Sequence, residues 1–130
     1  MKKKHFRWIM AVALAVVLLA GCKKEKASLN VSSDQVVGLW QKSGTQEYWH
    51  YFSNGTGNTW DEADGLHEGD SGSFSYTWYI TDGNLLCHDM KMHRNEYVTV
   101  PVRNYIREIN ATTMRWDEGT AEYTLVKLSN

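Results

Sequence analysis

From residue 36 to the C-terminus, hydrophobic and polar positions alternate along the sequence with a period of two. The alternation is clearest between residues 74 and 80, where one face of a predicted strand carries Phe74, Tyr76, Trp78 and Ile80. Such alternation is typical of a sheet with one buried face. Similar segments, rich in β-branched and aromatic residues, predict about eight strands. They cover residues 36–42, 48–52, 57–61, 73–81, 84–89, 97–103, 105–109, 113–118 and 121–128, with 105–109 either fused to the segment before it or following it.

The predicted strands are joined by short turn sequences. Asn54-Gly55, Asp82-Gly83 and Glu118-Gly119 stand between strands, where a hairpin needs residues that tolerate a positive φ. No stretch of this part has a helical period, and no repeat of fixed length occurs. The sequence therefore predicts an all-β fold, a small antiparallel up-and-down barrel, because closure removes the exposed edges of a meander. Pro101 cannot donate a hydrogen bond to a ladder, so we expect it at an edge or a bulge.

The first 21 residues have a different pattern, that of a secretion signal. An uncharged apolar run over residues 9–19 follows a basic cluster of Lys2, Lys3, Lys4 and Arg7. A transmembrane helix needs about 20 apolar residues, so this shorter run does not span a bilayer. We therefore expect a signal peptide over residues 1–21.

The junction Leu19-Ala20-Gly21-Cys22 resembles the lipobox of bacterial lipoproteins. In that family, small residues admit the processing enzymes, and the cysteine thiol receives a diacylglyceryl group. The resemblance implies cleavage after Leu19, Ala20 and Gly21 and lipidation of Cys22, so that acyl chains such as palmitate anchor the mature protein in a bilayer. Lys23 implies, by analogy with other lipoproteins, the outer membrane of the cell envelope, at its periplasmic or surface face. The alternative is an ordinary signal peptide with an incidental cysteine.

Beyond the signal, composition limits the classes of partner. Residues 22–35 are polar and rich in lysine and serine and predict a flexible tether, which leaves residues 36–130 as one domain. Loss of residues 1–21 removes four of the 14 basic side chains and none of the 15 acidic ones, leaving ten basic residues against 15 acidic. Because nucleic-acid binding usually requires a basic surface, we expect no nucleic-acid partner. Cys87 is the remaining thiol after Cys22, so we expect no internal disulfide and interpret Cys87 as a small buried hydrophobic residue.

Gly38-Leu39-Trp40 in the first predicted strand resembles the Gly-x-Trp signature of the lipocalin superfamily, in which the tryptophan plugs the closed end of the barrel. The segment Phe52-Ser53-Asn54-Gly55-Thr56-Gly57, the strand at 74–80 and the hairpin at 113–128 are similar to short lipocalin-like lipoproteins common in Bacteroidetes. The resemblance implies a basic residue over the tryptophan, either Lys127 or Arg115. The chain lacks the Thr-Asp-Tyr motif and C-terminal helix of longer lipocalins. A barrel of about eight strands is filled by its own side chains or holds one small ligand.

Aromatic residues expected to face the interior are the candidates for lining a ligand site. Their number suits an apolar or ring-bearing ligand, and the alternative is that they fill the core. They are Trp40, Trp49, Trp60, Tyr76, Trp78, Tyr97, Tyr105 and Trp116.

Few residues suggest catalysis or metal binding. His88, His93 and Glu96, with Asp89 and His50 nearby, are weak metal candidates that converge only if their loop folds back, and we expect exposed polar loop residues instead. The segment 61–70 holds five carboxylates without the spacing of an EF-hand, which predicts a solvated, mobile hairpin loop. No nucleophile motif occurs. We therefore expect no cofactor, no bound metal and no enzymatic activity.

Three functions are compatible with these features. The favoured one is a lipid-anchored envelope lipoprotein that binds a small apolar molecule or a glycan fragment. The second is a solid barrel that binds another envelope protein or inhibits an enzyme. The third, a metal-assisted enzyme, requires His88 and His93 to converge with a carboxylate. An internal cavity lined by aromatic residues favours the first function, whereas a filled interior with an exposed aromatic patch favours the second.

Overall fold

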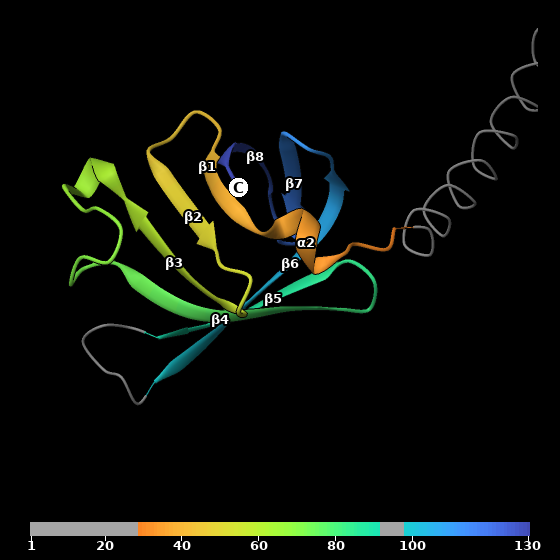
Figure 1. Cartoon of the computed structure of the whole chain (residues 1–130), viewed down its shortest axis with the longest axis horizontal. Coiled ribbons are helices and arrows are strands. Elements are labelled where there is room, and N and C mark those ends of the chain that lie inside the picture. The colour runs from red at the N-terminus through yellow and green to blue at the C-terminus, as the bar shows by residue number, and fades with distance from the viewer. Residues whose placement is uncertain (1–28, 92–97) are drawn as a thin grey trace, which may run out of the picture.

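The computed structural model describes residues 29–91 and 98–130, which form a closed barrel of eight β-strands (Figure 1). Each strand pairs antiparallel with the next, and β8 pairs with β1 to close the sheet. The predicted all-β up-and-down barrel is therefore confirmed. The strands are β1 (Gly38–Lys42), β2 (Glu47–Tyr51), β3 (Thr56–Asp61), β4 (Phe74–Thr81), β5 (Leu85–Lys91), β6 (Thr99–Ile109), β7 (Thr113–Asp117) and β8 (Glu122–Ser129).

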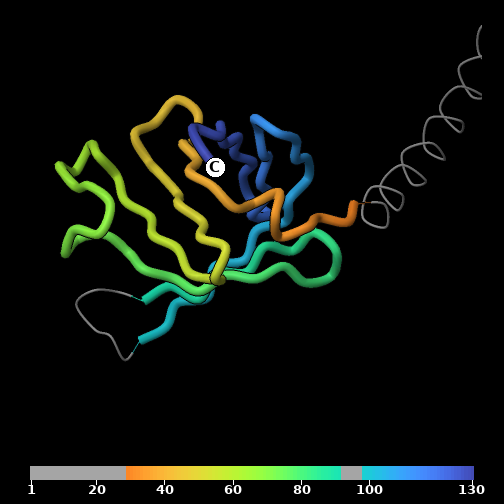
Figure 2. Tube along the Cα trace, in the orientation of Figure 1, coloured from red at the N-terminus to blue at the C-terminus, as the bar shows by residue number. Residues whose placement is uncertain are grey.

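Strand β6 joins the two segments predicted at 97–103 and 105–109 into one strand, the longest of the barrel (Figure 2). Its first half pairs only with β5, because pairing with β7 begins at Tyr105. Pro101 lies in this first half, opposite Asp89 of β5. The expected edge position of the proline is thus confirmed, and its missing N–H leaves the ladder with β7 intact.

Residues 29–36 close one end of the barrel, which corrects the tether expected over residues 22–35. The Val31 amide donates a hydrogen bond to the Gly83 carbonyl at 2.7 Å, in the turn between β4 and β5. A short helix, α2 (Ser33–Val36), follows, and Val31 and Val36 are 7% and 0% exposed. Two valines among polar residues give no periodic signal, yet both are buried in the core. The domain therefore begins no later than Leu29. Within the described ranges, no helix is long and apolar enough to cross a membrane.

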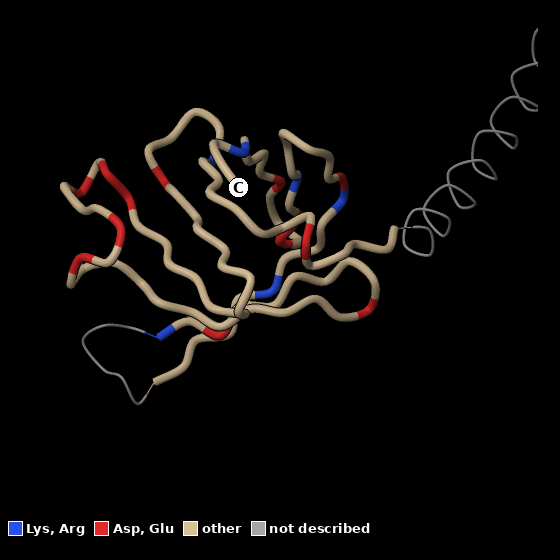
Figure 3. The backbone as a smooth tube through the Cα atoms, viewed as in Figure 1, with Lys and Arg blue, Asp and Glu red and all other residues tan. Residues whose placement is uncertain are grey.

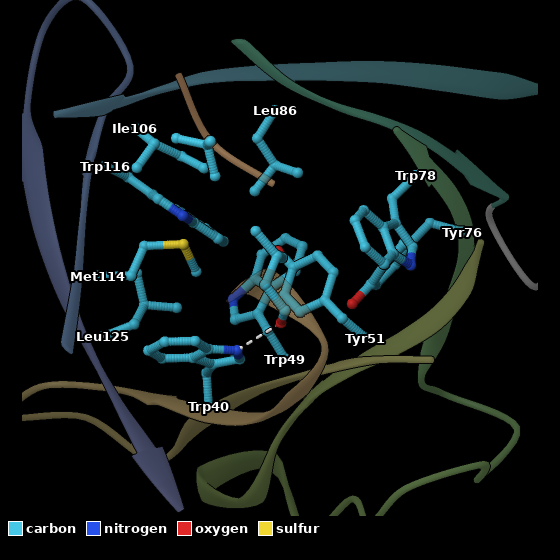
Figure 4. Close-up of a cluster of buried hydrophobic side chains, with 12 residues drawn as sticks. Trp40, Trp49, Tyr51, Tyr76, Trp78, Leu86, Ile106, Met114, Trp116 and Leu125 are labelled. Carbon is cyan, nitrogen blue, oxygen red and sulfur yellow. Dashed lines mark hydrogen bonds between the residues drawn. The ribbon is translucent and has the colours of Figure 1, made fainter. Parts of the chain in front are cut away.

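Trp40 plugs this closed end. Its side chain is fully buried, and its indole Nε1 donates a hydrogen bond of 2.8 Å to the Val36 carbonyl (Figure 4). The Lys127 ammonium lies 5.0 Å from the centre of the Trp40 ring, whereas the Arg115 guanidinium lies 3.6 Å from the Glu108 carboxylate. Of the two basic residues considered, Lys127 is therefore the one that covers the tryptophan.

Aromatic side chains fill the middle of the barrel above Trp40 (Figure 4). The Trp49 ring lies 5.0 Å from the Trp116 ring and 5.6 Å from the Tyr76 ring, measured between ring centres. Room for Tyr76 comes from Gly57 of β3, because a Cβ atom at position 57 would overlap the Tyr76 ring. The core is thus packed to the limit that the barrel diameter allows.

Replacing Gly57 tests this packing limit. We expect Gly57→Ala to lower the free energy of unfolding by about 1–3 kcal/mol, because the added methyl group overlaps the Tyr76 ring and also crowds the His50 backbone carbonyl. Urea denaturation followed by tryptophan fluorescence measures the change. Ser75→Ala, on the exposed face of β4, is the control. In a Tyr76→Leu background the same Gly57→Ala change should cost less; an equal cost in both backgrounds would show that the ring is not the obstacle.

Candidate functional site

The end of the barrel opposite Trp40 is open and contains a pocket of about 540 Å³. The closed end holds residues 29–36 and the turns that follow β2, β4 and β6. The pocket instead lies among the connections that follow β1, β3 and β7, since Lys42, Glu47, Asp61, Gly72 and Glu118 line it. We refer to it as the mouth pocket.

One wall of the mouth pocket is apolar. Phe74, Met90 and Val102 line it, and the strand registers place all three on the inner face of β4, β5 and β6. Phe74 points inward and is 36% exposed, because the described side chains leave it partly uncovered at the mouth. The floor of the pocket includes Trp49, which packs on the aromatic core below.

The rim of the mouth pocket is mostly acidic. Its one described lysine, Lys42, places its ammonium 3.6 Å from the centre of the Tyr123 ring. Other acidic residues follow on the loop between β3 and β4 (Figure 3). Among the residues that the structure describes, no three metal-capable side chains come together on this loop or elsewhere. The carboxylates that line the pocket are Glu47, Asp61, Asp64 and Glu118. These described residues of the rim therefore repel anions.

His88 lies below the pocket as a fully buried core residue, and the expectation of an exposed loop residue was wrong. The alternation of β5 continues to Lys91, so His88 faces inward. Its Nδ1 donates to the Val102 carbonyl at 3.2 Å, which leaves Nε2 to accept from the Tyr51 hydroxyl at 2.7 Å. Burial lowers the pKa of His88 to about 4 and raises the pKa of Tyr51 well above its usual value. Both groups are therefore neutral at pH 7.

The metal candidates within the described residues do not assemble around His88. Both of its ring nitrogens have protein partners. Asp89 faces the other side of β5 and forms an ion pair of 3.0 Å with Arg103. His50 forms a hydrogen bond of 2.6 Å with the Glu68 carboxylate on the outer surface of the barrel. His93 and Glu96 lie outside the described residues.

Two buried polar side chains beneath the pocket have no hydrogen-bond partner among the described residues. In Asn104, which is 0% exposed, both Nδ2 and Oδ1 lack a partner. In Trp116, which is 2% exposed, the indole Nε1 lacks one. Asn104 stands between Val102 and Ile106 on the inner face of β6, and Ile106 pairs with Trp116. The two unpartnered side chains are thus diagonal neighbours across adjacent strands. Sequence reasoning missed Asn104, whose only signal was a polar residue at an inward position of an otherwise apolar alternation.

The eight aromatic candidates divide into groups. Trp49 lines the mouth pocket from the inner face of β2. Trp60 also borders the pocket, but it pairs with Tyr48 on the outer face of the sheet and stacks on it at 5.4 Å between ring centres, so its expected inward position was wrong. Tyr105 is 41% exposed, so its expected inward position was wrong: in the continuous strand β6, Asn104 faces inward and Tyr105 outward. Tyr97 lies outside the described residues. The others fill the core and are Trp40, Tyr76, Trp78 and Trp116.

Cys87 is 1% exposed, as predicted for a small buried hydrophobic residue. It pairs with Tyr79 on one side and Arg103 on the other, on the outer face of the sheet. Its burial therefore comes from neighbouring long side chains and not from the barrel interior.

Comparison of the chain with protein-family models, with curated proteins and with solved structures gave no match. The functional proposal therefore rests on the geometry of the mouth pocket and of the polar groups beneath it.

The low pKa of His88 predicts acid-sensitive folding. The folded state binds the His88 proton only near pH 4, whereas the unfolded chain binds it near pH 6.5. Unfolding therefore takes up a proton between these values, so the free energy of unfolding is unaffected above pH 6.5 and falls by roughly 3 kcal/mol as the pH drops to 4. Urea denaturation at several pH values measures this slope. We expect His88→Gln to flatten it and His50→Gln, on the outer surface, to retain it; an unchanged slope in His88→Gln would assign it to other groups.

Proposed function

We propose that this protein is a lipid-anchored lipoprotein of the cell envelope that holds a small apolar or ring-bearing molecule, or a glycan fragment, in its mouth pocket. The observation that carries the proposal is the open pocket of about 540 Å³ above a filled core. Small-molecule sites typically have volumes of about 300–1,000 Å³ and mostly apolar walls with a few polar groups. The mouth pocket has this size and this mixture.

The walls of the mouth pocket favour a flat or ring-bearing ligand. Trp49 and Phe74 offer aromatic faces, and Val102 offers an aliphatic surface. The aromatic core closes the pocket below, so a long chain cannot thread through the barrel. The open pocket favours ligand binding over the solid-barrel interaction module, which would fit an interior filled up to the mouth.

The lipocalin-like family is part of this proposal. Trp40 at the closed end, covered by Lys127, supports the resemblance of the Gly38-Leu39-Trp40 signature. The short up-and-down barrel supports it as well.

The proposed anchor at Cys22 determines how the pocket is presented. Cys22 lies outside the described residues, and six residues, 23–28, separate it from Leu29. Such a segment reaches at most roughly 20–25 Å when extended. Because residues 29–36 lie at the closed end, we infer that the mouth faces away from the bilayer.

Intact-mass analysis of the membrane-extracted protein tests the anchor. We expect the wild-type chain to begin at Cys22 and to carry a diacylglyceryl group, because the lipobox cysteine is the acceptor. Cys22→Ala should remain unlipidated and uncleaved at this site. Cys87→Ala, which changes the buried cysteine, is the matched control and should be lipidated normally. A lipid-free wild-type chain would contradict the anchor.

Filling the mouth pocket tests ligand binding. We expect Val102→Trp to weaken binding of 1-methylnaphthalene at least about tenfold, because the indole occupies space that the ligand needs. Val126→Trp is the matched control, since Val126 is 39% exposed on the outer face of β8. Equilibrium dialysis of the full chain, with equal detergent on both sides, measures the affinity.

The control variant should bind as the wild type does. If neither the wild type nor the control retains the probe, and native mass spectrometry finds no co-purifying molecule, the proposed function is refuted.

A further inference from the structure

We propose that Asn104 and Trp116 form a hydrogen-bonding subsite beneath the mouth pocket for a neutral ligand that carries a carbonyl next to an N–H. Carboxamides, lactams and imides belong to this class. The inference rests on the proposed function and names the chemistry of its ligand.

The first support is the unpartnered state of these groups. The Asn104 amide is fully buried, and neither its nitrogen nor its oxygen has a hydrogen-bond partner; the same holds for Trp116 Nε1. Buried polar groups are nearly always paired, because leaving one unpaired costs about as much as a lost hydrogen bond. His88, which pairs with Val102 on the neighbouring strand, follows this rule through Tyr51 and the Val102 carbonyl. Two neighbouring exceptions on the inner face are therefore free to pair with a polar group from outside the described chain.

The second support is the position of the two groups. Asn104 is the next inward residue after Val102 on β6, and Trp116 is the inward residue before Glu118. Val102 and Glu118 both line the mouth pocket. Each unpartnered side chain is therefore the next inward-facing residue below a residue that lines the pocket. The Trp49 indole lines the pocket and contacts the Trp116 ring at 5.0 Å between ring centres. Because neither Asn104 nor Trp116 lines the pocket itself, the proposal requires the Trp49 indole to move aside when a ligand binds.

The third support is the match of donors and acceptors. Asn104 offers two N–H donors and one carbonyl acceptor, and Trp116 offers one N–H donor. A ligand carbonyl can accept from both residues, while an adjacent ligand N–H donates to Asn104 Oδ1. An ether or hydroxyl group leaves part of this set unpaired.

The charges of the described residues around the pocket disfavour an anion. These residues place four carboxylates and one lysine on the rim, and that lysine lies against the Tyr123 ring. Because burial lowers the pKa of His88 to about 4, this histidine supplies no positive charge at pH 7. A carboxylate ligand would therefore enter a buried site without a compensating charge, at a large cost.

Three probes with one ring system test the subsite: 1-naphthamide, 1-methylnaphthalene and 1-naphthoate. We expect the full chain to bind 1-naphthamide about tenfold more tightly than 1-methylnaphthalene, and 1-naphthoate more weakly than either, in equilibrium dialysis with equal detergent on both sides. Asn104→Leu, which has nearly the same shape, should abolish the preference for the amide while 1-methylnaphthalene still binds.

Two further measurements separate a ligand subsite from a structural role. Asn104→Leu should raise Tm by several degrees, because it removes an unpaired polar group. A lowered Tm would show that the amide has a partner within the fold and would overturn the subsite. In wild-type protein, the Trp116 indole N–H resonance, assigned by its loss in Trp116→Phe, should shift when 1-naphthamide binds and not when 1-methylnaphthalene binds.

The outcomes distinguish the two proposals. Equal affinity for the amide and the hydrocarbon, or an unmoved Trp116 resonance, overturns the subsite and leaves the ligand-binding function in place. If no probe binds, the proposed function fails and the subsite fails with it.

Discussion

The internal volume of an eight-stranded barrel is the constraint on which the rest of this structure depends. Such a barrel is just wide enough for its own side chains or for one small ligand. Here Trp40 and residues 29–36 occupy the closed end, and large aromatic rings occupy the middle so tightly that β3 has room only for Gly57 beside Tyr76. Space remains only at the mouth, where the inward positions of β2 and β3 carry shorter or polar residues such as Thr59 and Glu47. The mouth pocket is the part of the interior that the aromatic core does not reach.

A tightly filled interior also makes its polar groups informative. In a medium of low dielectric, a satisfied hydrogen bond is strong and an unsatisfied group is costly. His88 shows the satisfied case: two partners fix its tautomer, and burial keeps it neutral. Asn104 shows the other case, because its amide faces the same interior without a partner. The contrast between two polar residues on adjacent strands is what separates ordinary core packing from the proposed subsite.

Sequence reasoning was reliable where the period of two was unbroken and where turns carried glycine. The strands and the turns were predicted on these grounds and are confirmed. The place of Trp40 at the closed end was expected from a resemblance and not from the period, and Trp40 is fully buried there. Sequence reasoning failed where one residue decided the outcome. Because β6 was predicted as two segments, the inward position of Asn104 was not recognised and Tyr105 was assigned to the inner face, whereas it lies on the outer face. Two isolated valines gave no pattern, so the ordered segment before α2 was taken for tether. Unpaired side-chain atoms depend on the distances between strands, which no sequence period encodes.

The closed end and the short proposed tether together bear on where a ligand would come from. With residues 29–36 packed under the barrel, the proposed anchor at Cys22 would lie a short chain length from the plugged end, and the mouth opens on the opposite side. A ligand would therefore arrive through water and not directly from the bilayer. A hydrocarbon chain partitions poorly into water, whereas a small ring with an amide group dissolves in it and can still bury its ring against Trp49. The orientation of the barrel and the unpaired donors beneath its mouth thus favour the same class of molecule, although they are independent features of the fold.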